Sequence, residues 1–261
     1  PPVHAEVNVS IDFRTPLEPY GQWRHNDRWG DVWTPAHVEK DWAPYTRGRW
    51  VYTDDWGWYW ISEESEADWG WAAYHYGHWF FDPAEGWIWI PGREWAPAWV
   101  TWRRGTHRIG WAPQPPDEVY VEITDNPHYW VFVEARDFNS DRLWTEIEPG
   151  WHHTGFLQET VIVNRTVLIR ERGPIIAVNP GIEPALIARE VGEPIRTYEV
   201  SPVVLEGTAD IEGAIKVRPE EGPGKSKQQQ IQQTSNIVEP AKTEEPPQAL
   251  GPNENGRLGD R

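Results

Sequence analysis

The chain has 261 residues, of which 20 are tryptophan, and a formal net charge of −17. This acidic balance argues against nucleic acids and anionic membrane surfaces as partners, because both attract patches of lysine and arginine. The absence of cysteine excludes disulfides, thiolate zinc sites and cysteine nucleophiles.

Methionine is also absent, even at position 1. We therefore expect the chain to begin after a processing event, such as removal of a secretory signal. The lack of oxidisable sulfur suits an oxidising compartment. No apolar run approaches the roughly 20 residues that a membrane-spanning helix needs. These features predict an exported protein of the periplasm, the outer-membrane periphery or the cell surface, without a membrane span.

Residues 1–19 form a lead-in segment with one candidate strand, residues 6–13, in which apolar residues alternate.

Residues 20–116 form a repeat rich in tryptophan and glycine. Each unit has a glycine followed two residues later by a tryptophan. A second glycine lies nine residues after the first glycine, and a second tryptophan lies ten residues after the first tryptophan. These positions are Gly21, Trp23, Gly30 and Trp33 in the first unit, Gly48, Trp50, Gly57 and Trp60 in the second, and Gly77, Trp79, Gly86 and Trp89 in the third.

Each unit ends in a phrase similar to Trp-Ala-Pro-Tyr, and a degenerate fourth unit runs from Gly105 to Pro113. Period-2 alternation predicts an antiparallel β-hairpin in each unit. In the second unit we expect Trp50 opposite Trp60 and Tyr52 opposite Trp58. A three-residue loop then requires a left-handed residue, which Gly57 supplies, as Gly86 does in the third unit.

We expect the tryptophan faces of successive hairpins to stack into one aromatic layer, within a sheet or a small barrel. The opposite faces differ in polarity. The first hairpin carries Arg24 and Asn26 there and is expected to be solvated, whereas the third carries Phe80 and Asp82 and is expected to be the most covered.

The sequence predicts a second β-rich subdomain over residues 117–218. It contains one short helix at residues 184–191, which Gly192 terminates. The candidate strands are residues 119–123, 129–134, 159–164, 166–170 and 175–178, with a further strand after the helix. We expect a mainly β chain with almost no helix before residue 180. Residues 219–261 form a low-complexity tail, which we expect to lie extended against a partner chain or a second copy.

The repeat phrases resemble a known family. They include "PLEPYGQW" (16–23), "PYTRGRWVYTDDWGWYWIS" (44–62), "WGWAAYHYGHW" (69–79), "GWIWIPG" (86–92) and "GWAPQPP" (110–116). They are similar to bacterial exported Trp/Gly-rich repeat proteins of the "domain of unknown function 6600" type, also called FecR-like or YXWGXW-repeat proteins. The resemblance implies export and a β-rich fold, and it implies no established activity or catalytic residue.

Exposed tryptophan rings could stack on sugar rings or on a partner chain. The candidates for such stacking are Trp29, Trp56, Trp58, Trp69 and Trp71. Trp29 and Trp56 are predicted at hairpin tips, where burial is hardest. The alternative is that other repeat units or a partner chain cover these rings.

Other polar residues carry weaker signals. The acidic stretch at residues 62–68 lacks the spacing of a calcium loop and is interpreted as a solvated loop. His75 and His78 would lie on opposite faces of a strand, which disfavours joint metal binding. We therefore predict no catalytic, cofactor-binding or metal-binding residues.

Two functions remain from the sequence. The first is a non-enzymatic structural or protein-interaction subunit of the bacterial envelope or cell surface, which binds other protein chains or itself. The alternative is a carbohydrate-binding module that uses exposed tryptophan and tyrosine. Burial of the tip tryptophans favours the first function, and a row of aromatic rings facing solvent favours the second.

Overall fold

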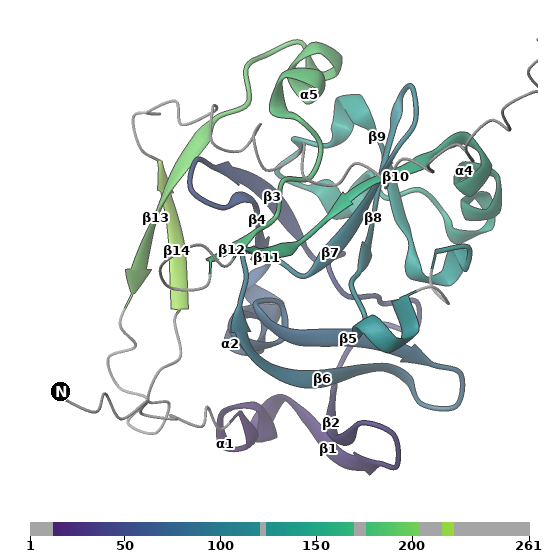
Figure 1. The fold of residues 1–261 in the computed structure, drawn as a ribbon, viewed down its shortest axis with the longest axis vertical. Helices are drawn as coiled ribbons and strands as arrows, with labels where there is room; N and C mark the ends of the chain where they lie inside the picture. The colour runs from purple at the N-terminus through teal and green to yellow at the C-terminus, as the bar shows by residue number, and fades with distance from the viewer. Residues whose placement is uncertain (1–12, 121–123, 170–175, 204–215, 222–261) are drawn as a thin grey trace, which may run out of the picture.

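The computed structural model describes residues 13–120, 124–169, 176–203 and 216–221 (Figure 1). The strand predicted at residues 6–13 lies outside the described residues except for its last residue. The predicted start of the tail at residue 219 is wrong, because residues 219–221 end a paired strand; the tail beyond residue 221 lies outside the described residues. The described part is mainly β and contains several antiparallel sheets, as the sequence predicts.

The first three repeat units each form a hairpin, and the degenerate fourth unit supplies the second strand of a fourth hairpin, whose first strand precedes Gly105. The strands of the four hairpins are β1 (Gly21–Asn26) with β2 (Gly30–Pro35), β3 (Gly48–Thr53) with β4 (Gly57–Ser62), β5 (Tyr76–Asp82) with β6 (Gly86–Trp95), and β7 (Val100–Arg104) with β8 (Arg108–Pro113). Each hairpin places one tryptophan opposite another. The pairs are Trp23 with Trp33, Trp50 with Trp60, Trp79 with Trp89, and Trp102 with Trp111. The predicted register of the second hairpin is confirmed, including Tyr52 opposite Trp58.

The two recurring glycines have different physical roles. The second glycine of a unit adopts a positive φ, 77° at Gly57 and 78° at Gly86, which confirms the predicted turn. In the first two units the first glycine lies against the ring of the second tryptophan, whereas Gly77 of the third unit adopts a positive φ of 65°. A Cβ atom on Gly48 would lie 2.6 Å from Cζ2 of Trp60 and 2.2 Å from the carbonyl oxygen of Ile61. The spacing of the repeat therefore places one glycine at the turn and, in the first two units, another beneath the ring of the second tryptophan.

The hairpins do not follow one another in a single sheet. The first and third share a four-stranded sheet of order β1-β2-β6-β5, joined where Trp33 pairs with Trp89. The second hairpin lies in a sheet of order β14-β13-β3-β4, with β13 (Thr197–Val203) and β14 (Lys216–Glu221). The fourth lies in a sheet of order β10-β7-β8-β9, with β9 (Val131–Glu134) and β10 (Val161–Arg165). Strands from both sides of residue 116 therefore share sheets (Figure 1).

The region after the repeats follows the sequence prediction in part. β9, β10, β11 (Val167–Ile169), β12 (Ile176–Val178) and β13 confirm predicted strands, and β11 pairs with β12. Helix α5 (Pro184–Val191) has the predicted bounds and ends at Gly192, whose φ is 87°. The strand predicted at residues 119–123 is wrong at its start, because Asp117–Val119 form a 3-10 turn directly after Pro116.

The expectation of almost no helix before residue 180 is wrong. Helices α1 (Arg14–Leu17), α2 (Ala67–Ala73) and α4 (His153–Glu159) precede that position. So do the 3-10 helices of the described residues, which are Glu18–Tyr20, Glu64–Glu66, Asp117–Val119, Pro127–Tyr129, Ala135–Asp137, Leu143–Thr145 and Gly150–His152. Helix α2 forms where the second repeat unit reaches its final phrase, and it buries Trp69 and Trp71. Burial of these rings therefore outweighs the expected strand pattern.

Tryptophan fills the interior. The fully buried indoles are Trp33, Trp58, Trp60, Trp79, Trp89, Trp102, Trp111 and Trp130. Rings from different hairpins are in contact, as between Trp50 and Trp102, whose centroids lie 4.7 Å apart. One aromatic cluster therefore joins the sheets, which confirms the expectation that aromatic rings replace an aliphatic core.

Tyr45 explains why the units end in a recurring phrase. Its backbone lies in the left-handed region, with φ 60°, although its side chain is buried. The hydroxyl donates to the carbonyl oxygen of Tyr74 at 2.9 Å and accepts the backbone N–H of Trp99 at 3.0 Å. The carbonyl oxygen of Tyr45 accepts the indole N–H of Trp111 at 2.9 Å. The end of the first unit is thereby bonded to the end of the second unit, to the start of the fourth hairpin at Trp99 and to Trp111 within that hairpin.

The prediction for the outer hairpin faces needs correction. Val51 and Thr53 of the second hairpin are buried, whereas Asp82 of the third is partly exposed, so the second hairpin is the more covered. The cause is tertiary packing: Trp56, Trp95 and Tyr198 pack against Val51 and its neighbour. Arg24 of the first hairpin is exposed, as expected.

Candidate functional site

Three of the five tryptophans proposed for stacking are unavailable to a ligand that approaches from solvent. Trp58 is 0% exposed, Trp69 4% and Trp71 9%. The indole N–H of Trp58 donates to the carbonyl oxygen of Ile182 at 2.8 Å, and that of Trp71 to the carbonyl oxygen of Asp68 at 3.0 Å. These three rings are core residues, and the indole N–H groups of Trp58 and Trp71 are bonded within the chain.

The two tip tryptophans are partly exposed. Trp56 packs edge-on against Trp95, with ring centroids 4.7 Å apart. The ring centroids of Trp29 and Phe80 lie 6.0 Å apart, and the guanidinium of Arg28 lies 4.6 Å from the ring centroid of Trp29. Each ring is therefore already partnered within the chain. The two belong to hairpins of different sheets, so they do not extend one aromatic surface.

The acidic stretch at residues 62–68 is not uniformly solvated, which corrects the sequence interpretation. Glu66 is only 4% exposed. Its carboxyl group accepts the hydroxyl of Tyr74 at 2.5 Å and the indole N–H of Trp42 at 2.6 Å. Burial raises the pKa of Glu66 to about 7, although the two hydrogen bonds oppose that shift. Glu66 is thus a buried acid that titrates near neutrality.

The two histidines near the start of the third unit, His75 and His78, have different contacts within the chain. His75 is stacked against Tyr59, with centroids 4.7 Å apart, and burial lowers its pKa to about 4. His78 contacts the carbonyl oxygen of Gln114 through Nδ1, at 3.0 Å. Within the described ranges no group of three or more His, Asp or Glu side chains is arranged to hold a metal ion.

A polar pocket of about 160 Å³ opens beside the start of β3. Its wall combines aromatic rings with charged and amide side chains from three distant segments, and comprises Arg49, Trp50, Val51, Tyr52, Asn139, Ser140, Asp141, Glu193, Arg196 and Tyr198. Arg49 pairs with Asp141 at 3.3 Å. Burial raises the pKa of Tyr52 to about 12, so its hydroxyl stays neutral. We call this the β3 pocket; no local sequence motif indicates it.

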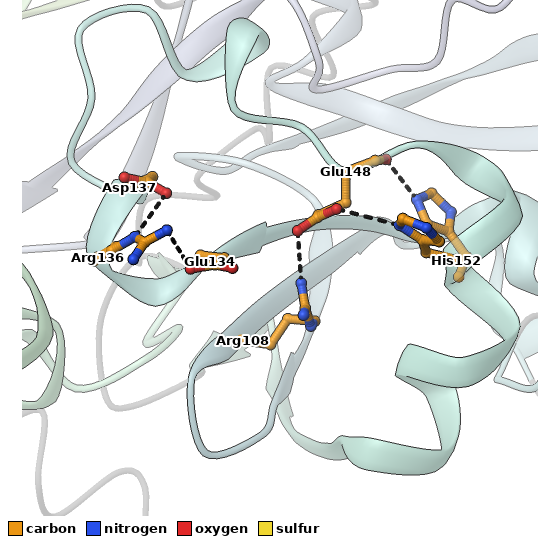
Figure 2. Close-up of polar contacts among 7 residues, drawn as sticks. Arg108, Glu134, Arg136, Asp137, Glu148 and His152 are labelled. Atoms are coloured by element: carbon orange, nitrogen blue, oxygen red, sulfur yellow. Dashed lines mark hydrogen bonds and ion pairs between the residues drawn. The ribbon is translucent and has the colours of Figure 1, made fainter.

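A network of ion pairs covers one side of the β8–β9 pair (Figure 2). The carboxylate of Glu148 accepts a hydrogen bond from the guanidinium of Arg108 at 2.9 Å, and its other oxygen lies 3.4 Å from Nδ1 of His152. Nearby, Arg136 reaches Glu134 at 2.9 Å and Asp137 at 3.5 Å. Arg108 also lies 3.7 Å from the ring centroid of Phe156. These contacts tie the segment around α4 to the sheet, which is a structural role.

The edge strand β10 presents three consecutive aliphatic side chains to solvent. Val161 is 66% exposed, Ile162 37% and Val163 42%. Among the residues that the structure describes, β10 is the terminal strand of its sheet and pairs only with β7, with a register shift between Ile162 and Asn164. The sequence predicts this strand, but it does not show that the strand lies at an edge. We call residues 161–163 the β10 apolar edge.

A buried arginine fixes the position of β10. Arg103 of β7 donates to the hydroxyl of Thr160 at 3.0 Å and to the carbonyl oxygens of Thr160 and Leu157, both at 2.9 Å. Its guanidinium lies 4.9 Å from the ring centroid of Trp130. The residue before β10 is thus clamped to the sheet, so the β10 apolar edge is held in place before any partner binds.

The repeats also match a family model. Residues 14–118 match the family described as "Family of unknown function (DUF6600)". The match supports the resemblance that the repeat phrases indicate, and it ends close to the predicted end of the repeat domain. No match was found among curated proteins or among solved structures. No helix within the described ranges is long and apolar enough to cross a membrane.

Proposed function

We propose that this chain is a non-enzymatic protein-interaction subunit of the bacterial envelope or cell surface. The observation that carries the proposal is the β10 apolar edge, where Val161, Ile162 and Val163 are exposed on a terminal strand. Such an edge offers unpaired backbone groups beside apolar side chains, which is the surface that strand addition uses. Residues of this kind are normally covered by a partner.

The use of tryptophan supports a scaffold role. Many of the tryptophan rings pack the sheets against one another, as the contact between Trp50 and Trp102 illustrates. Burial of Trp58, Trp69 and Trp71 favours an interaction subunit over a row of sugar-stacking rings. The proposed export follows from the resemblance to exported repeat proteins and from the missing sulfur residues.

Fractionation and capture test the proposal. The chain would be tagged at the 3′ end of its own gene, so that any leader segment is kept, in a bacterium that carries it naturally, and the envelope fraction would be compared with the cytoplasm. We expect the wild type to enter the envelope fraction and to capture protein chains there, whether other proteins or an untagged copy. Val161→Lys should lose them, because it places a charge on the apolar edge. Val38→Lys, at an exposed valine outside β10, is the matched control.

Two results would overturn the proposal. One is recovery of the chain in the cytoplasmic fraction alone. The other is capture of the same chains at the same yield by wild type and Val161→Lys, because the β10 apolar edge would then have no part in binding.

Carbohydrate binding is the second candidate, and the β3 pocket favours it. The pocket combines Tyr52 and Tyr198 with the side chains of Asn139 and Arg49, a mixture that suits the apolar face and the hydroxyl groups of a sugar. Its volume of about 160 Å³ is below the roughly 300–1,000 Å³ of sites for drug-sized ligands. We therefore propose a single sugar ring as the ligand of this second candidate.

Calorimetric titration with a panel of neutral and amino monosaccharides tests this candidate. Binding should appear for wild type and fall in Asn139→Ala, which removes an amide from the pocket wall. Gln158→Ala, at an exposed position on α4, is the control. An absence of heat for every sugar, or equal binding by Asn139→Ala, would remove carbohydrate binding from consideration.

A further inference from the structure

A second, smaller pocket lies between the tip of the β7–β8 hairpin and helix α5, and its wall is basic. Arg104 ends β7, Arg108 begins β8, and Arg189 lies in the last turn of α5. Among the described residues that line the pocket, Glu190 is the only acid. This local excess of arginine contrasts with the net charge of −17 of the whole chain. We call it the α5 pocket; it shares no described lining residue with the β3 pocket.

Two of the three arginines have no partner. Within the described ranges, neither the guanidinium of Arg104 nor that of Arg189 makes a hydrogen bond or an ion pair. The third, Arg108, is already paired with a carboxylate (Figure 2). The acid of the pocket, Glu190, lies 3.3 Å from Nδ1 of His107 instead. Arg104 is only partly exposed, and a charge that is withdrawn from water without a partner is unfavourable. The two guanidinium groups therefore favour a bound anion.

The surroundings of the pocket limit the kind of anion. Four of its lining residues are apolar and buried, namely Ile109, Ala135, Ile182 and Ile187. Charges beside such a surface are screened less by water, which strengthens their attraction. The pocket has a volume of about 20 Å³, and one water molecule needs roughly 10–15 Å³. The pocket therefore admits a small group at the end of a ligand and not a sugar ring.

We propose that the α5 pocket binds a phosphate group, either as inorganic phosphate or as a phosphate monoester. A phosphate monoester carries a charge of about −1.5 to −2 at pH 7, which balances the guanidinium groups of Arg104 and Arg189. Arginine donates through a planar fork that matches phosphate oxygens. The two arginines come from β7 and α5, so they can donate to different oxygens of a tetrahedral group. A carboxylate has two oxygens, which one guanidinium satisfies alone. The hydroxyl of Thr106, which also lines the pocket, is a further donor.

Titration of the purified full chain with phosphate probes tests the proposal. The chain would be dialysed free of phosphate at low ionic strength and near neutral pH. Inorganic phosphate and glycerol 3-phosphate would then be added separately and followed by phosphorus NMR. We expect saturable binding, and the probe that binds more tightly identifies the ligand as free phosphate or as a monoester. Arg104→Gln and Arg189→Gln should each weaken binding by at least about tenfold, because a hydrogen bond between charged groups contributes that much.

Two further variants separate the pocket from the charge of the chain as a whole. Arg142→Gln removes an exposed arginine that does not line the pocket, and it should bind phosphate as wild type does. Glu190→Gln removes the acid from the pocket wall and should bind phosphate more tightly. Arg189 is exposed, so its variant keeps the fold, which circular dichroism would verify. Bound phosphate should also raise the melting temperature of wild type, and this rise should be lost in Arg189→Gln.

Several results would refute the phosphate site. They are an absence of saturable binding for both probes, binding that neither Arg104→Gln nor Arg189→Gln weakens, and an equal loss in Arg142→Gln. Acetate that binds as tightly as phosphate would also refute it, because the pocket would then select any anion. The inference goes beyond the proposed function and does not depend on a partner at the β10 apolar edge. Capture of protein chains without phosphate binding would leave the proposed function standing, and phosphate binding without capture would leave this inference standing.

Discussion

Trp102 donates its indole N–H to Oδ1 of Asn179 at 2.6 Å, and both residues are fully buried. The same asparagine donates its side-chain amide to the carbonyl oxygen of Trp58 at 2.8 Å. Its backbone carbonyl accepts the N–H of Trp58, and its N–H donates to the carbonyl oxygen of Trp56. One residue just beyond β12 therefore joins β4 and β7, which belong to different sheets.

Replacing Asn179 with leucine tests this junction. The variant keeps a similar volume but leaves the indole N–H of Trp102 without its acceptor and the carbonyl oxygen of Trp58 without its side-chain donor. Buried groups left without partners cost about 1–3 kcal/mol each, so we expect a loss of roughly 2–4 kcal/mol in the free energy of unfolding. Equilibrium urea denaturation measures it. Gln158→Leu, at an exposed site, should change stability by less than about 0.5 kcal/mol; equal stability of the two variants would contradict the proposed role.

Alanine at the turn glycines separates backbone strain from steric conflict. Gly57 and Gly86 have almost the same φ, but a Cβ atom on Gly57 would lie 2.1 Å from the carbonyl oxygen of Asn179, whereas nothing lies within 4 Å of one on Gly86. Gly86→Ala should cost about 1–2 kcal/mol from the left-handed conformation alone. Gly57→Ala should cost clearly more. Melting temperatures that fall equally in both variants would show that the contact with Asn179 does not constrain the turn.

The first glycine of the second unit gives a further prediction. Gly48→Ala should destabilise the fold strongly, because the added methyl group would overlap the ring of Trp60 and the carbonyl oxygen of Ile61. Gly155→Ala is the matched control, since Gly155 lies within α4 with open space around it. That variant should gain about 0.5–1 kcal/mol from the reduced backbone entropy of the unfolded chain. Chemical denaturation of both measures the contrast, and a stable Gly48→Ala variant would exclude the proposed packing.

The sequence predicts the hairpins because register is a local property. Alternation and the turn glycine together determine that Trp50 faces Trp60. The neighbours of each hairpin are not local. The pairing of Trp33 with Trp89 joins the first and third units, and no spacing in the chain indicates that the second unit is left out of this sheet.

The candidate sites show the same limit. The strand at residues 161–165 follows from its β-branched residues, but its place at the edge of a sheet depends on the order in which strands assemble. The β3 pocket combines residues as far apart as Arg49 and Arg196. Glu66 is surrounded in sequence by acidic and small residues, so only its contacts with Trp42 and Tyr74 reveal its burial.

Glu66 makes the stability of the fold depend on pH. Its pKa is about 7 in the folded chain, compared with an ordinary value of 4.5. Between these values the folded state binds more protons than the unfolded state, so this residue's contribution to stability is lost as pH rises from about 4.5 to about 7. Glu66→Gln, which resembles the protonated acid, should therefore gain stability over wild type across that range, by about 3 kcal/mol in total, and then level off.

Urea denaturation of both proteins at each pH measures this difference. The comparison cancels other titrations, such as that of His75, whose lowered pKa weakens both proteins as pH falls from about 6.5 to about 4. Glu64→Gln, which removes an exposed carboxyl group from the same acidic stretch, is the control. If Glu66→Gln differed from wild type by the same amount at every pH, the carboxyl group of Glu66 would titrate alike in both states, and its burial between Trp42 and Tyr74 would carry no energetic consequence.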